Sequence, residues 1–81
     1  ELGGKVKARD LGFNRVVSVR IRFLVGLDGR VESAEVLTKK TPDLGFREAA
    51  LEAIRKMEFE PIVYRGRNIK IYFVKRIVFQ P

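Results

Sequence analysis

Two runs of alternating apolar and polar residues flank the dipeptide Asp28-Gly29, and this pattern constrains the fold more than any other feature of the chain. Alternation over residues 15–25 and 31–38 is typical of strands that bury one face. Asp-Gly favours a two-residue type I′ turn, which needs positive φ at both central residues. This predicts a hairpin whose register pairs apolar residues on one face and opposite charges on the other: Ile21 with Val36, Phe23 with Ala34 and Arg22 with Glu35.

Residues 41–57 carry the signals of one amphipathic helix. Thr41 is a favourable N-cap and Pro42 a favourable first helical residue, although Gly45 favours a regular helix that begins a turn later. At about 100° per residue, one face is apolar and is expected to lie in the core. Its residues are Phe46, Ala49, Ala50, Ala53, Ile54 and Met57. We expect Pro61 to stop the helix and Phe59 to pack under the sheet.

After a turn predicted at residues 64–68, a last strand is expected from Ile69 to Phe79, and it is apolar at both parities. Such a strand is either central in a sheet or an edge that something else covers. Lys75 breaks the inward parity, which predicts either a β-bulge there or pairing with a partner that stops short of it. A helical crossover favours the second and third strands being parallel with the first between them, which places the last strand at an edge.

The order strand, strand, helix, strand predicts an α+β fold. We expect a three-stranded antiparallel or mixed sheet in a split βαβ arrangement, with one helix packed on one face. The 81 residues suffice for one domain, expected over residues 14–81, with residues 1–13 as a loose lead-in. Because the chain begins at Glu1 rather than Met, we interpret it as a fragment whose anchor or targeting segment lies in the longer parent.

The composition argues against catalysis and against a bound metal or cofactor. The chain has no histidine and no cysteine, which removes the commonest general base, the commonest metal ligand and thiol chemistry. Glu32 and Glu35 have opposite strand parity, so they do not form a carboxylate pair. No phosphate-cradling glycine-rich loop precedes the helix, and no apolar run is long enough to span a membrane. We therefore expect a binding module that is not an enzyme.

The basic charge is concentrated at the end of the chain. The net charge is +7, and residues 61–81 carry five basic residues and no acidic one, which favours an acidic partner. A nucleic-acid module is the main rival from another class, because Tyr72 and Phe73 stand beside Lys70 and Lys75. These two aromatic residues alternate faces and cannot form one stacking surface, so we expect no nucleic acid as partner.

Five elements in order and spacing resemble the TonB C-terminal domain family, over about residues 16–80. They are the strand 19–25 with Asp28-Gly29-Arg30-Val31 and Val36-Leu37, the helix 44–57, Phe59-Glu60-Pro61, the segment 66–71 and the ending 77–79. The resemblance implies a TonB/TolA C-terminal-domain-like fold in the bacterial periplasm, tethered to the inner membrane in the parent protein. It also implies a link, through the missing N-terminal segment, to an inner-membrane proton-channel motor.

In that family, a short box peptide of an outer-membrane transporter adds as a strand to the last strand, which is β-augmentation. The resemblance implies the same role here for Asn68, Ile69, Lys70, Ile71, Tyr72, Phe73, Val74, Lys75 and Arg76. The Tyr-Pro element that many members carry before the first strand is absent from residues 1–15. A homodimer through the same edge is compatible with this interpretation. The alternatives are a TolA-like domain or another envelope, secretion or signalling interaction domain.

Overall fold

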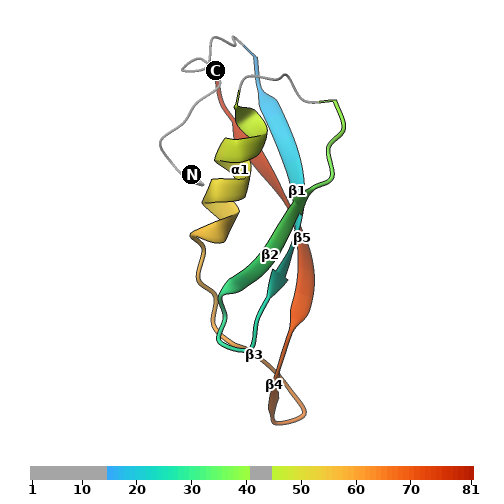
Figure 1. The fold of residues 1–81 in the computed structure, drawn as a ribbon, viewed down its shortest axis with the longest axis vertical. Coiled ribbons are helices and arrows are strands. Elements are labelled where there is room, and N and C mark those ends of the chain that lie inside the picture. The colour runs from blue at the N-terminus through green and yellow to red at the C-terminus, as the bar shows by residue number, and fades with distance from the viewer. Residues whose placement is uncertain (1–14, 41–44) are drawn as a thin grey trace.

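The computed structural model describes residues 15–40 and 45–81, in which one helix lies on one face of a three-stranded sheet (Figure 1). The elements in chain order are β1 (Val17–Val25), β2 (Val31–Val36), α1 (Phe46–Arg55), β3 (Ile62–Tyr64), β4 (Arg67–Ile69) and β5 (Ile71–Phe79). The sheet order is β2-β1-β5, and both outer strands are antiparallel to β1. The predicted α+β arrangement with the last strand at an edge is therefore confirmed for the described residues.

The first hairpin has the predicted register but not the predicted turn. Ile21 pairs with Val36, and Phe23 with Ala34, as expected. Gly29 has a φ of 84°, whereas Asp28 does not have positive φ, so the type I′ prediction is wrong. Instead, the Gly29 N–H donates to the Gly26 carbonyl (3.0 Å), which closes a three-residue loop in which Gly29 takes the left-handed conformation.

A β-bulge in β2 restores the register that the longer turn would otherwise shift. Val25 pairs with Val31, but Leu24 pairs with Ser33, so Glu32 is the extra residue. Without this bulge, the three-residue loop would displace the pairing of all subsequent residues by one and turn the apolar face of β2 away from the core. Turn and bulge together therefore keep Ala34 and Val36 on the side of the helix.

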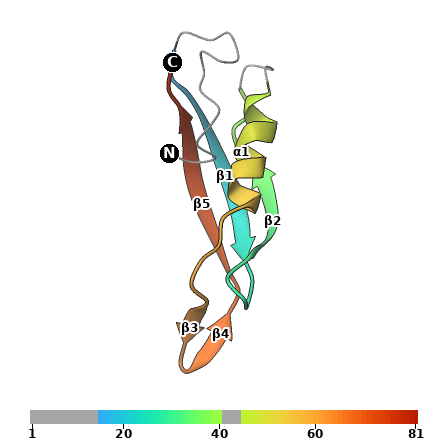
Figure 2. The same cartoon turned by 90° about the vertical axis from the view of Figure 1, so that its left-hand side faces the viewer.

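The helix begins at Phe46, one turn later than Thr41-Pro42 would place it, and Thr41 and Pro42 themselves lie outside the described residues. Gly45 is the N-cap, with a φ of 88° and no side-chain hydrogen bond. The predicted apolar face is correct: Phe46, Ala50, Ala53 and Ile54 are buried, and Ala49 and Met57 are half-buried. The helix packs mainly against β2 and β1, which leaves β5 beside it (Figure 2).

Pro61 is not the residue that ends the helix. The helix ends at Arg55, where the Met57 N–H bonds to the Ile54 carbonyl at 3.1 Å. The chain then becomes extended, and the Phe59 N–H donates to the Gly29 carbonyl at 2.9 Å. The backbone is therefore already engaged with the first turn before Pro61 is reached. Phe59 packs under the sheet as predicted, with its ring 5.7 Å from that of Phe23.

The segment predicted as one turn and one long strand is two elements and a corner. β3 and β4 form a short hairpin that projects from one end of the molecule (Figure 1). Its tip is Arg65-Gly66, with φ of 52° and 77°, so the positive φ pair expected at Asp28-Gly29 occurs here instead. The predicted last strand is interrupted at Lys70, where the chain passes from pairing with β3 to pairing with β1.

The core lies between the helix and the inner face of β1, and it includes the end of β5. Every odd-numbered residue of β1 is buried, which is the period of a strand with one buried face. The buried apolar residues are Val17, Val19, Ile21, Phe23, Val25, Phe46, Ala50, Ala53, Ile54, Ile77 and Phe79. Each fully buried large side chain contributes about 1.5–3 kcal/mol, so β1 is the strand around which the domain is built.

Candidate functional site

The candidate site is the strand β5, which is paired on one side only. Its nine residues pair with β1 without interruption, from Ile71 opposite Val25 to Phe79 opposite Val17. On its other side, no strand of the described residues is hydrogen-bonded to it. An edge strand presents a row of outward N–H and C=O groups that can template another strand. With respect to residues 15–40 and 45–81, β5 is therefore a main-chain surface open to pairing along its length.

The inner face of β5 changes from buried to accessible along its length. Ile77 and Phe79 are buried, and Phe79 packs against Phe46 with ring centroids 5.2 Å apart. Lys75 and Ile71 are half-buried, and Phe73 is 40% exposed. Because the helix covers β1 and β2, the first half of β5 keeps part of its apolar inner face accessible.

The outer face of β5 is largely apolar, and none of the described elements covers it. Tyr72, Val74 and Val78 are exposed by 61%, 59% and 42%. Arg76 lies between the two valines on the same face, as the period of two requires. Exposed apolar side chains that adjoin an open strand edge mark a surface for association.

Three phenylalanine rings connect the accessible part of β5 to the core. The ring centre of Phe59 lies 5.7 Å from that of Phe23 and 6.3 Å from that of Phe73. The ring centres of Phe23 and Phe73 are 5.9 Å apart. Phe23 is buried, Phe59 half-buried and Phe73 exposed, so the cluster runs from the centre of the sheet to its edge. Such aromatic pairs add about 0.5–1.5 kcal/mol to the stabilisation from burial. They hold the exposed Phe73 ring against a rigid support.

Lys75 does not mark a bulge. It pairs with Ile21 within an uninterrupted register, so its side chain points to the inner face. The side chain is half-buried, which lets its apolar stem pack along the sheet while the ammonium group reaches water. The bulge predicted at Lys75 is therefore wrong, because a long cation can occupy an inward position at the uncovered margin of the sheet.

The nine residues predicted to contact a partner do not form one continuous edge. Asn68 and Ile69 belong to β4 and pair with Val63 and Ile62 of β3. The Asn68 side-chain amide donates to the Leu27 carbonyl at 3.2 Å. Ile71, Tyr72, Phe73, Val74, Lys75 and Arg76 lie in β5, whose edge continues through Ile77, Val78 and Phe79. The apolar pattern of the sequence predicted that the strand includes these last three residues, but the family resemblance did not assign them to the site.

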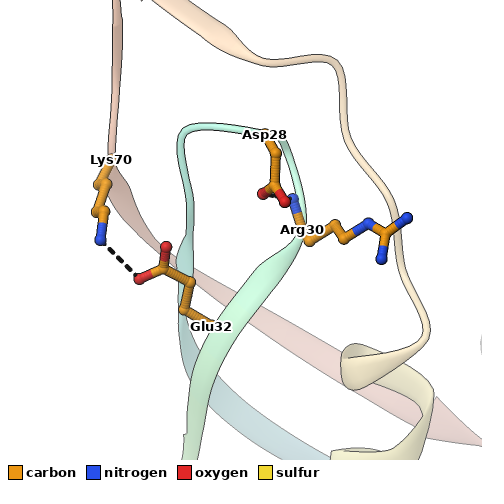
Figure 3. A network of polar contacts seen from close by, with 4 residues as sticks. All are labelled: Asp28, Arg30, Glu32 and Lys70. Carbon is orange, nitrogen blue, oxygen red and sulfur yellow. Dashed lines mark hydrogen bonds and ion pairs between the residues drawn. The ribbon is translucent and has the colours of Figure 1, made fainter.

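An ion pair joins the corner at which β4 becomes β5 to the first hairpin. Lys70 Nζ lies 2.9 Å from Glu32 Oε1, on the bulged residue of β2 (Figure 3). Figure 3 also shows Asp28 directed at the backbone of Arg30, whose N–H donates to Asp28 Oδ1 at 3.0 Å. The Arg30 side chain points away from this pair and lies 3.9 Å from the Glu58 carboxylate. Of these contacts, the Lys70–Glu32 ion pair is the one that joins the start of β5 to the first hairpin.

A polar network lies on the outer face of the sheet, across its three strands. The Arg22 guanidinium forms an ion pair with Glu35 of β2 and lies 5.2 Å from the centre of the Tyr72 ring of β5. These three residues, with Ser33 and Ala34, line a shallow hollow of about 190 Å³. A guanidinium over an aromatic face contributes about 0.5–1 kcal/mol at an exposed site. The network holds Tyr72 in place beside the open edge.

The described residues offer neither a metal site nor a membrane-crossing helix. They contain no group of three or more acidic, histidine or cysteine side chains that could hold a metal ion. Within the same residues, no helix has the length and apolar character that crossing a membrane requires. What the described surface does offer is a strand edge with apolar residues on both faces.

Comparison with known proteins agrees with this geometry. The family model described as the Gram-negative bacterial TonB protein C-terminal matches residues 14–81, which is most of the chain. The comparison with curated proteins gives no match. Members of the matched family are protein-interaction domains of energy transducers rather than enzymes; they lie in the periplasm and interact with outer-membrane transporters. The chain therefore belongs to the family of the TonB C-terminal domain.

Proposed function

We propose that the chain is the periplasmic interaction domain of a TonB-like energy transducer, and that it binds the box peptide of an outer-membrane transporter as an added strand beside β5. The observation that carries this proposal is the open edge of β5, which adjoins no strand of residues 15–40 and 45–81. In strand addition, main-chain hydrogen bonds give affinity and pockets for alternate side chains give specificity.

Side chains on both faces of β5 support the same proposal. A peptide strand beside β5 would direct its alternate residues to the two faces of the sheet. On the inner face, one set would adjoin Phe73 and Lys75; on the outer face, the other would adjoin Tyr72 and Val74. Phe73 and Tyr72 are held by the phenylalanine cluster and by Arg22, so their contact surfaces are preorganised.

The position of β5 suits the transmission of a pulling force. β5 is bonded along all its residues to β1, which is the central and most buried strand. Ladder hydrogen bonds run perpendicular to the strands, so a pull along the added strand would load many of them at once. We propose that the parent protein is tethered to the inner membrane and receives proton-motive-force-derived energy there through its N-terminal segment.

An NMR titration of the ¹⁵N-labelled chain tests the binding mode. The probes are synthetic peptides from the periplasmic N-terminal segments of outer-membrane transporters of Gram-negative bacteria. Amide shifts are expected to concentrate between Ile71 and Phe79, in the edge strand β5. Shifts that concentrate on α1 or on the β2 edge, or the absence of shifts with every peptide, would contradict the proposal.

Two controls distinguish strand addition from other contacts with the same residues. Successive N–H groups of a strand point to opposite edges, so N-methylation at alternate residues removes the donors of one edge of the peptide only. Of two peptides methylated at the odd or at the even positions, the one that keeps the donors directed at β5 should bind and the other should not. Sedimentation of the free chain over a range of concentrations tests whether a second copy occupies the edge. A homodimer would compete with the peptide, and the apparent peptide affinity would then fall as the protein concentration rises.

A further inference from the structure

Two arginine residues occupy directly opposite positions on the outer face of the sheet, which none of the described helices covers. Arg20 of β1 is directly opposite Arg76 of β5, so both project from the outer face. Both are exposed, and neither forms an ion pair with any of the described residues. Like charges directly opposite each other in a sheet are destabilising, so this pair does not serve the stability of the isolated domain.

Two bases near the Arg20–Arg76 pair have acidic partners. Arg22, which is two residues from Arg20 on the same face, has Glu35 opposite it on β2, and Lys70 reaches Glu32. In the row of Arg20 and Arg76, the neighbour on the β2 side is Leu37, whose N–H donates to the Arg20 carbonyl at 2.8 Å. β2 therefore supplies no acid next to Arg20. On the other side of the pair, Arg76 lies at the open edge of β5.

The surroundings of Arg76 define what could lie beside it. Val74 and Val78 flank it on the outer face, two residues away on each side, and both are exposed. A strand added to β5 would place one residue opposite Arg76, and its neighbours two positions away opposite Val74 and Val78. Charge complementarity thus calls for an acidic residue at the centre of an apolar strip.

We propose that Arg76, assisted by Arg20, selects a peptide strand that carries Asp or Glu on the outer face, flanked at two residues' distance by apolar side chains. This inference rests on the proposed strand addition at β5 and names the chemistry of the partner. A carboxylate can accept two parallel N–H bonds from one guanidinium, and the second guanidinium adds attraction without a further contact. The acid would also relieve the repulsion between the two arginines.

Selection from a random peptide display library tests this preference without a known partner. The baits are the wild-type chain, the double variant Arg20→Gln with Arg76→Gln, and a matched control that removes two exposed cations elsewhere, Lys39→Gln with Arg55→Gln. Peptides selected by the wild type and by the control should be enriched in Asp or Glu between apolar residues at ±2. The Arg20→Gln, Arg76→Gln bait should lose this enrichment. Equal acid enrichment with all baits, or none with the wild type, would overturn the inference.

A charge exchange with one selected peptide gives the magnitude. Replacing the central acid by its amide should weaken binding to the wild type by about two- to fivefold, as for a single exposed ion pair. Replacement by Lys should weaken it further, and Arg76→Glu should restore the Lys peptide while it weakens the acidic one. If both peptides bind Arg76→Glu and wild type equally, Arg76 does not read the acid.

Amide shifts recorded in the same titrations separate failure of this inference from failure of the proposed function. If the shifts lie along Ile71–Phe79 but binding ignores the charge exchange, strand addition stands and the arginine preference falls. If the selected peptides shift amides away from β5, both fall. Folding of each variant is verified first from the dispersion of its amide spectrum, which substitutions of exposed side chains should preserve.

Discussion

Lys70 and Glu32 form an ion pair of 2.9 Å that joins the bulge of β2 to the corner between β4 and β5. β1 lies between β2 and β5, so the Glu32 side chain must pass over the end of β1 to reach Lys70. It passes over Gly26, where a Cβ atom would collide with the Glu32 carboxylate. A glycine at this position therefore allows the contact that orients the start of the proposed binding edge.

The first prediction concerns Gly26→Ala, which should abolish the coupling between Glu32 and Lys70. A double-mutant cycle with Glu32→Gln and Lys70→Gln should give about 0.2–1 kcal/mol in the wild type, because both groups are partly exposed. In the Gly26→Ala background, the same cycle should give a value near zero. Urea unfolding of the eight chains provides the free energies. An unchanged coupling energy would show that the carboxylate reaches Lys70 by another route.

The first hairpin shows why its register was predictable and its turn was not. The alternation of apolar residues specified that Ile21 faces Val36, because only this register places both on the side of the core. The same register arises from a two-residue turn, or from a three-residue loop followed by one bulge at Glu32. Both solutions place the same side chains in the core, so the apolar pattern does not distinguish them. The contact between Gly29 and Phe59, which favours the longer loop, is a tertiary interaction.

The second prediction compares two glycines that both have left-handed backbone. Gly29 has a φ of 84°, and a Cβ there would collide with the Phe59 carbonyl, whereas Gly66 has a φ of 77° and open space around it. Gly66→Ala should therefore cost only the left-handed conformation, about 1–2 kcal/mol. Gly29→Ala adds a backbone collision and should cost about 3 kcal/mol or more. Denaturant unfolding measures both, and equal losses would contradict the close approach of Phe59.

The candidate site was predictable in part, because the sequence of β5 is apolar at both parities. That pattern predicted a strand from Ile69 to Phe79 that is either central or a covered edge, and the helical crossover favoured the edge. The division at Lys70 was not visible, because Ile69 continues the same parity although it pairs with Ile62 in a different sheet. The pairing of Arg20 with Arg76 was not visible in the sequence either. It depends on the register of β1 against β5, which joins residues far apart in the sequence and is set by the packing of the helix and core.

The third prediction concerns pH. The hydrogen bond from Lys56 and its charge lower the pKa of Glu52 below its ordinary value of 4.5. A lowered pKa in the folded state means that the pair stabilises the fold above about pH 4.5 and loses this effect as the pH falls through the folded pKa. The stability difference between the wild type and Lys56→Gln should therefore be present at neutral pH and shrink in acid. Lys40→Gln, which lacks this partner, should show no such dependence.

An NMR titration of the Glu52 side-chain carboxyl carbon measures the same effect directly. Its pKa should lie below 4.5 in the wild type and rise in Lys56→Gln. The pair spans one helical turn in the favourable order, with 2.8 Å between its charged atoms, and it is exposed. An unchanged Glu52 titration in Lys56→Gln would show that the contact does not persist in solution.

The last prediction is that removing one charge from the Arg20–Arg76 pair stabilises the free domain. Arg20→Gln should raise the free energy of unfolding by about 0.2–1 kcal/mol, because it ends the repulsion between directly opposed cations. Arg76→Glu should raise it at least as much, because it creates an opposite-charge pair. The gain should diminish in high salt, which screens exposed charges, whereas Arg55→Gln on the helix should show no comparable gain. Thermal unfolding at low and high ionic strength measures this, and a salt-independent loss of stability in Arg20→Gln would mean that its stem packing outweighs the repulsion.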